Sequence, residues 1–330
     1  MFVKSGKLNL INDGQFGSTG KGAAAAFIGC SEHVDLAISD ASVNAGHTFY
    51  KDNKKYVTRH LPITALFNKR SQIYLCAGAI IDPTILLQEI ELFDIDPCRI
   101  AIHPRAAVIE QCDIDQEQEG MMKSISSTRK GVGNALARKI KRESKLAADH
   151  PLLKEYVKEL DVNWLLEQDI NAVMEVPQGF DLSINSGLSY PYCTSREITV
   201  SSALSDAQVH PSLLGNVMTC IRTYPIRVGN IIEDGKEVGY SGPFYDDSKE
   251  LSWKDIGVPE EYTTNTNRIR RVATFSMKQY GRMIAINKPT HVFLNFANYM
   301  KKRELNKLIK LLGNVTHLGF GPRIEDIVEL

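Results

Sequence analysis

Short apolar runs and longer stretches of helical period alternate along most of the chain. The first apolar run, Lys7–Ile11, is typical of a strand and leads into a glycine-rich turn. Asp82 and Pro83 predict a helix that runs through Phe93, with the aspartate as its cap and the proline in its first turn. A second helix is expected over Met300–Leu312. Further strands are predicted at Val34–Ile38, Gln72–Ile81, Arg99–His103, Asn171–Val176, His291–Phe296 and Asn314–Leu318.

This rhythm predicts an α/β fold with a mainly parallel central sheet flanked by helices. We expect one catalytic domain over residues 1–330, with a helical excursion at about residues 110–170. Residues 119–170 are polar, rich in Lys and Glu, and helical in period. Glycine, proline, aspartate and asparagine cluster within residues 229–271. A loop-rich stretch of this length is seldom an inert connection, so we expect it to contact substrate.

Charge and cysteine content narrow the classes of function. Lys plus Arg and Asp plus Glu each number 39, so the net charge is zero and disfavours binding to a nucleic-acid backbone. No apolar run approaches the roughly 20 residues of a membrane-spanning helix. The N-terminal apolar run is too short for a signal peptide. The six cysteines form no CxxC pair, which favours reduced thiols in a cytoplasmic protein.

The glycine-rich segment Asp13–Gly22 follows the first predicted strand and precedes an alanine-rich helix. Glycines let backbone N–H groups approach an anion, the helix N-terminus adds partial positive charge, and Lys21 adds a full one. The segment departs from the standard P-loop, because Gln15 and Gly22 occupy positions where that motif has Gly and Ser/Thr. It predicts a phosphate-binding turn, with an ordinary glycine-rich connection as the alternative.

Three later clusters have the same polar character. Ser42–Thr48 follows the second predicted strand, at the end of a strand where α/β proteins bind ligands. Ser126–Gly133 mixes hydroxyls, cations and glycines, and it is either a phosphate contact or a solvated turn. Thr263–Arg271 contains three arginines, which suit bidentate recognition of a carboxylate.

In this order the four clusters resemble the adenylosuccinate synthase family. Further segments continue the resemblance over nearly the whole chain: Glu175–Gly179, Tyr190–Ser195, Arg227–Gly229, Gly242–Phe244 and Gly321–Pro322. The family transfers the γ-phosphoryl group of a nucleoside triphosphate to O6 of a 6-oxopurine nucleotide. The amine of aspartate then displaces phosphate at C6. The resemblance therefore implies a carbon–nitrogen ligase that uses Mg²⁺.

The resemblance also implies a set of site residues. The catalytic residues would be Ser18, Lys21, His47 and Gln178. The triphosphate donor would contact Gly17, Thr19, Gly20, Lys21, Gly22, His47, Thr48, Arg270, Asn298, Gly321 and Pro322. The purine nucleotide would contact Ser18, Asn44, Ala45, Thr128, Arg142, Gln178, Thr194, Val228 and Arg268. Aspartate would contact Thr266, Asn267, Arg268 and Arg270, and the metal would contact Ser18 and Gly46. Arg142 would act from a second subunit, which implies a homodimer.

Ser18 departs from the family pattern. The family turn reads GDEGKGK, so Ser18 stands where the family has its catalytic aspartate. A serine hydroxyl is a poor base without an activating partner. Guanine, however, carries a 2-amino group beside N1, and a small hydroxyl leaves room for that group and can accept a hydrogen bond from it. This change resembles a phage branch of the family that converts dGMP to 2-amino-2'-deoxyadenylosuccinate, so we expect dGMP as substrate.

Asn298 replaces the family aspartate that reads the guanine of GTP. A carboxylate accepts two hydrogen bonds from guanine, whereas an amide donates one and accepts one. That pattern suits adenine, so ATP or dATP is the expected phosphoryl donor.

Two alternatives remain at this point. One is an ordinary adenylosuccinate synthase that uses IMP and GTP, against which Ser18 argues. The other is a nucleotide-binding regulator without turnover, against which the retained Lys21, His47 and arginine cluster argue. The neutral charge and the lack of aromatic-basic interleaving predict no nucleic-acid partner, and no membrane partner is expected.

Overall fold

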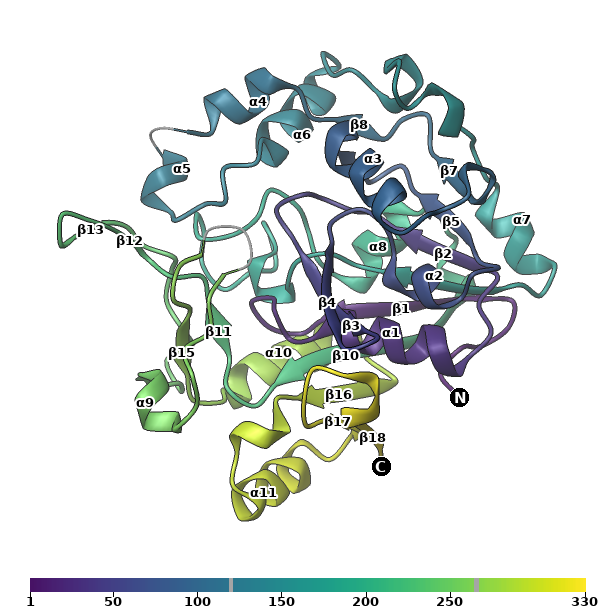
Figure 1. Ribbon diagram of the computed structural model, residues 1–330. Coiled ribbons are helices and arrows are strands. Elements are labelled where there is room, and N and C mark those ends of the chain that lie inside the picture. The colour runs from purple at the N-terminus through teal and green to yellow at the C-terminus, as the bar shows by residue number, and fades with distance from the viewer. Residues whose placement is uncertain (119–120, 264–266) are drawn as a thin grey trace.

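The computed structural model describes residues 1–118, 121–263 and 267–330. Its centre is a sheet that holds nine strands among these residues, parallel except where the last strand pairs antiparallel with its neighbour (Figure 1). In spatial order the strands are β18 (Ile327–Glu329), β17 (Val315–Gly319), β16 (His291–Asn295), β10 (Leu214–Arg222), β1 (Lys7–Asp13), β9 (Asn171–Glu175), β2 (Leu36–Ser39), β5 (Gln72–Leu75) and β7 (Ile100–Ile102).

Side chains of the central strands alternate between two apolar cores. Leu36 and Ile38 of β2 face one core, and Ala37 between them faces the other. This alternation follows from the two-residue period of a strand. Because both faces are buried, the strands read as continuous apolar runs, as in other parallel sheets covered on both sides.

Helices cover both faces of the sheet. The first core includes residues of α1 (Lys21–Ser31), α2 (Ile63–Phe67) and α3 (Pro83–Leu92). The opposite face packs against α7 (Val162–Glu167), α8 (Val200–Asp206), α10 (Met277–Asn287) and α11 (Lys302–Leu312). The α/β architecture predicted from the sequence is confirmed.

Smaller elements surround the sheet. They are the pair β3 (His47–Lys51) and β4 (Lys54–Thr58), the pair β6 (Ile80–Ile81) and β8 (Ala107–Val108), the trio β11 (Ile226–Arg227), β15 (Arg271–Ala273) and β14 (Glu250–Leu251), the pair β12 (Ile231–Glu233) and β13 (Lys236–Gly239), and the helices α4 (Gln111–Gln116), α5 (Met121–Ser124), α6 (Val132–Lys141) and α9 (Trp253–Ile256). The β12–β13 hairpin projects from the body (Figure 1). Across the described ranges, no helix is long and apolar enough to cross a membrane.

The predicted elements are largely confirmed, with three corrections. The single strand expected over Gln72–Ile81 is wrong: β5 ends at Leu75, and the chain turns at Gly78, where an added Cβ would lie 2.4 Å from the Asp206 side chain. The helical period of residues 119–170 is realised only in short helices separated by turns. Strand β10 was not predicted, because polar residues such as Thr219 interrupt its apolar pattern. Thr219 is buried and donates to Asn12 Oδ1 at 2.6 Å.

The close packing of α1 on α2 gives a test of the fold. A Cβ at Gly29 would lie 2.6 Å from the Thr64 carbonyl oxygen, so Gly29→Ala should destabilise the protein by about 1–3 kcal/mol through overpacking. Gly281, inside α10, has no atom within 4 Å of its ideal Cβ. Gly281→Ala is therefore the matched control, and it should stabilise by about 0.5–1 kcal/mol. Urea unfolding measures both, and equal effects would contradict this account of the packing.

Candidate active site

Six neighbouring strands of the sheet lead into segments that meet at the same edge. Parallel strands place their carboxyl ends together, which is where α/β folds bind ligands. The segments that follow these strands include Gly17–Lys21 after β1, Asn44–Thr48 after β2, Gln178 after β9, Arg227 and Val228 after β10, Asn298 after β16, and Gly321 and Pro322 after β17.

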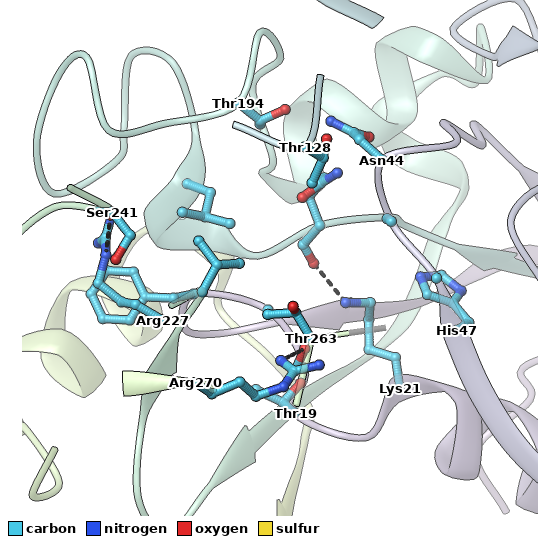
Figure 2. A pocket seen from close by; sticks show the side chains of 18 of the residues that line it. Thr19, Lys21, Asn44, His47, Thr128, Thr194, Arg227, Ser241, Thr263 and Arg270 are labelled. Atoms are coloured by element: carbon cyan, nitrogen blue, oxygen red, sulfur yellow. Dashed lines mark hydrogen bonds between the residues drawn. The ribbon is translucent and has the colours of Figure 1, made fainter. Parts of the chain in front are cut away.

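These segments line one cavity of about 870 Å³. Figure 2 shows its arrangement, with Thr128 and Thr194 opposite Arg270, and Lys21 and His47 together on one side. The predicted site residues that line the cavity are Gly17, Ser18, Thr19, Gly20, Lys21, Gly22, Asn44, Ala45, Gly46, His47, Thr48, Thr128, Gln178, Thr194, Val228, Arg270, Asn298, Gly321 and Pro322.

A buried carboxylate organises the glycine-rich turn. One oxygen of Asp13 accepts from the backbone N–H groups of Gln15 at 2.8 Å and Gly17 at 3.2 Å. Its other oxygen accepts from the Thr19 hydroxyl at 2.5 Å and from Lys21 Nζ at 3.2 Å. The side chain is fully buried, so the charge of Lys21 and these donors replace the lost solvation.

Lys21 stands at the first position of α1 and bridges two walls of the cavity. Besides Asp13, its ammonium donates to the Gln178 carbonyl oxygen at 2.6 Å. Gln178 has a φ of 65° and contributes a buried Nε2 that has no hydrogen-bond partner among the described residues. A buried amide without a partner is costly unless a ligand completes it, so this group fits a ligand-binding role.

His47 begins β3 on the same side of the cavity as Lys21. Burial, reinforced by the charge of Lys21, lowers the pKa of His47 to about 3. Its Nδ1 lies 3.9 Å from Glu175 Oε2, and burial raises the pKa of that carboxyl. The Nε2 of His47 is buried without a partner within the described part of the chain. The imidazole is therefore neutral at ordinary pH and able to donate one hydrogen bond to a phosphoryl oxygen.

Glu117, which the sequence did not single out, shapes the wall that carries Thr128. Its carboxylate accepts from the backbone N–H groups of Gly131 at 2.7 Å and Gly133 at 2.9 Å. The loop that leads into α6 is tightly turned, with Arg129 at a φ of 52° and Gly131 at 78°. Glu117 thus fixes the start of α6 beside the cavity.

Arg227 and Ser18 also line the cavity. Arg227 is buried and donates to the carbonyl oxygens of Ser241 at 2.6 Å, Tyr192 at 3.0 Å and Pro243 at 3.2 Å. Burial, together with nearby Arg271, lowers its pKa to about 10. Ser18, at a φ of 55°, accepts a hydrogen bond on its hydroxyl from Arg270 Nη1.

Several predicted residues lie apart from the cavity lining. Arg142 caps α6 in the left-handed region at a φ of 69° and is exposed. Asn267 is exposed, and Arg268 reaches the Ser126 carbonyl oxygen at 3.2 Å. Thr266 lies outside the described residues.

The sequence reasoning missed Asp13, Glu117, Arg227 and Glu261 as site residues. Asp13 had a usable signal, because an acidic residue ended a predicted strand directly before a glycine-rich turn. Glu117 had none, since it is one of many charges in a polar stretch.

The sequence profile of the family described as "Adenylosuccinate synthetase" matches residues 11–159 and 150–308, which together span most of the chain. The chain belongs to the adenylosuccinate synthetase family.

Two relatives within the adenylosuccinate synthetase family are phage enzymes. The N6-succino-2-amino-2'-deoxyadenylate synthase of Acinetobacter phage SH-Ab 15497 is 35% identical over 355 residues, covering 96% of this chain and 91% of that protein. The enzyme of the same name from cyanophage S-2L is 36% identical over 334 residues, covering 97% of this chain and 91% of that protein.

Solved structures of the adenylosuccinate synthetase family share the fold. The succinoaminodeoxyadenylate synthetase of cyanophage S-2L, bound to dGMP and to dATP as an energy donor, matches with a TM-score of 0.88 and 34% identity over 98% of this chain and 95% of that chain. The adenylosuccinate synthetase of Plasmodium falciparum matches with a TM-score of 0.80 at 18% identity, over 98% of this chain and all of that chain (100%), and supports the fold alone.

The low pKa of His47 has a consequence for stability. Because its folded pKa of about 3 lies below the ordinary 6.5, the unfolded chain binds more protons between these values. We therefore expect the free energy of unfolding to include the full contribution of His47 above pH 6.5. That contribution should decrease progressively as the pH falls below 6.5. Urea unfolding between pH 7 and 5 should show a shallower pH slope for His47→Gln than for the wild type. An NMR titration in which the His47 imidazole titrates near pH 6.5 would contradict the assignment.

Proposed function

We propose that this protein joins L-aspartate to C6 of dGMP, with ATP or dATP as phosphoryl donor. The products are 2-amino-2'-deoxy-N6-succinyladenylate, phosphate, and ADP or dADP. The observation that carries the proposal is Ser18, a small hydroxyl that lines the cavity where the family has a carboxylate. The cyanophage S-2L relative bound to dGMP and dATP supports the same substrate pair.

The chemistry proceeds in two steps. In the first, the γ-phosphoryl group moves to O6 of the purine while the N1 proton passes to water, and charge builds on the transferring oxygens. Lys21 and the amides of the glycine-rich turn stabilise that charge, and neutral His47 donates a hydrogen bond to it. In the second, the aspartate amine attacks C6, phosphate departs, and the amine loses a proton. Gln178 and Thr194 hold the purine, and Arg270, which lines the cavity, holds the carboxylate of aspartate.

Oxygen ligands at this site fit Mg²⁺. That ion binds in most phosphoryl-transfer sites through one or two protein oxygens and the substrate phosphates, without an all-protein cage. The Gly46 carbonyl belongs to a residue lining the cavity and would hold it; the Ser18 hydroxyl accepts from Arg270 and would have to release that guanidinium to do so. When bound, it would neutralise charge on the donor phosphates.

We assign Asn298 to bind the purine base of the phosphoryl donor. This residue is exposed and lines the cavity, as do Gly321 and Pro322. Its amide presents one donor and one acceptor, which match N1 and N6 of adenine. dGMP, aspartate and nucleoside triphosphates are all cytoplasmic metabolites, so we assign the enzyme to the cytoplasm.

Phosphate release by the purified protein with Mg²⁺, dATP and aspartate tests the substrate. We expect turnover with dGMP and little with IMP. Ser18→Asp should lower kcat/KM for dGMP by about 100-fold, because the added carboxylate crowds the 2-amino group. The kcat/KM for IMP, which has no 2-amino group, should not fall. Ser18→Asn, of the same size without the charge, is the matched control that separates crowding from charge.

The same assay decides between the alternatives. Turnover with IMP and GTP alone would favour ordinary adenylosuccinate synthesis. Binding of dGMP by calorimetry without phosphate release from any pair would favour a regulator.

Arg142 supports a homodimeric enzyme. Arg142 is exposed and does not line the cavity of its own subunit. The family resemblance nevertheless implies that it binds the phosphate of the purine nucleotide. We therefore propose that it serves the cavity of a partner subunit.

Complementation tests this assignment. Arg142→Ala and Lys21→Gln should each be inactive. An equal mixture should recover about a quarter of wild-type activity, because half of the dimers carry one site with both wild-type residues. Subunits must be mixed under exchange conditions verified by labelled chains. Full exchange without recovery would sink the proposal that Arg142 acts across the interface.

A further inference from the structure

Glu261 is an unassigned carboxylate at the junction of three walls of the cavity. It lies on the segment that leads into the arginine cluster, and it lines the cavity. Its two oxygens pair with Arg222, at 2.5 Å to Nη2 and 3.1 Å to Nη1. The Arg222 side chain is fully buried, and that of Glu261 is 19% exposed. Such a bidentate pair fixes the plane of both groups.

Arg222 also contacts the glycine-rich turn and the segment that contains Asn298. Its Nη1 also donates to the Ser18 carbonyl oxygen at 3.2 Å. Its guanidinium lies 3.8 Å from the centre of the Phe296 ring. Phe296 lines the cavity two residues before Asn298 and holds a φ of 56°. The planar cation thus supports a ring in the segment assigned to the donor purine.

Arg270 is the third partner. Its Nε lies 4.0 Å from Glu261 Oε2 and donates to the Tyr262 carbonyl oxygen at 3.1 Å. Its Nη1 donates to the Ser18 hydroxyl. Burial lowers the pKa of Arg270 to about 10, with the charge of Glu261 opposing and that of Arg222 reinforcing the shift. Ser18 is therefore held from both sides, its carbonyl by Arg222 and its hydroxyl by Arg270.

The charges in this cluster do not cancel. Two guanidinium groups face one carboxylate. Glu261 neutralises the charge of Arg222, so the positive charge of Arg270 remains in excess. Burial acts to raise the pKa of Glu261, but the charges of Arg222 and Arg270 lower it overall, which keeps the carboxylate ionised. Without that carboxylate, two buried cations would repel each other beside Ser18.

We infer that Glu261 is a positioning residue: it neutralises Arg222 so that Arg270 stays against Ser18 with surplus positive charge for the carboxylate of aspartate. The inference rests on the proposed function, because it assigns aspartate to Arg270. It adds that one carboxylate aligns the turn that reads the purine with the loop that receives the amino acid.

Kinetics of Glu261→Gln in the full-length protein test this role. We expect KM for aspartate to rise about tenfold and kcat to fall about tenfold, because Arg270 leaves Ser18. Affinity for dGMP alone, measured by calorimetry without aspartate, should change by less than about threefold, since the residues proposed to hold its purine, Gln178 and Thr194, lie on other segments. Glu261→Asp should recover part of the loss. Glu260→Gln, a neighbouring exposed carboxylate, is the matched control and should behave as the wild type.

A second variant guards against loss of the fold. The double change of Arg222→Met with Glu261→Gln removes the buried cation together with its bidentate partner, so Arg270 no longer faces a second buried cation. It should fold, bind dGMP, and recover much of the KM for aspartate that Glu261→Gln loses. Wild-type KM for aspartate in Glu261→Gln, or a KM in the folded double variant as high as in Glu261→Gln, would overturn the inference. Failure of the wild type itself to turn over dGMP with aspartate would instead reject the proposed function.

Discussion

The buried carboxylate of Asp13 is the constraint on which the rest of the site depends. It ends the central strand β1 and accepts from two backbone amides, a hydroxyl and the Lys21 ammonium. Those bonds give the glycine-rich turn its shape and leave Lys21 positioned between Asp13 and the Gln178 carbonyl. The turn also bonds to Gln178, Arg222, Arg270 and Asn295, so its geometry is passed on to the segments that carry them.

A second level of organisation comes from charged groups that bind backbone. Glu117 holds the amides at the start of α6, and Arg227 joins two carbonyls of the loop that follows β13 to the carbonyl of Tyr192. Neither needs to touch a ligand to matter. Each fixes a segment whose own side chains or backbone line the cavity, which is how a site built largely from loops acquires defined geometry.

Much of this could be predicted from the sequence. Apolar runs identified most of the parallel strands, because strands buried on both faces lack polar interruptions. Strand β10 was not predicted, because the polar Thr219 interrupts its apolar run. In the structure Thr219 is satisfied by a hydrogen bond to Asn12 inside the sheet. The clusters that line the cavity were recognisable because glycine, hydroxyl and cation combinations are unusual at strand ends. Glu117 and Glu261 were not, since a carboxylate that binds a distant backbone or arginine has no local pattern.

One close contact has a consequence for protein engineering. Gly20 adopts a φ of 91°, and a Cβ there would lie 1.9 Å from Asn295 Nδ2, while the same amide donates to the Thr19 carbonyl oxygen at 3.3 Å. The phosphate turn and the end of β16 therefore interlock, with Asn298 only three residues further on. A segment transplanted from a GTP-dependent relative to change donor preference would have to bring a compatible residue at position 295. On the proposed assignment of Asn298 to the donor base, a change of donor preference requires matched changes in both segments and not the exchange of a single residue.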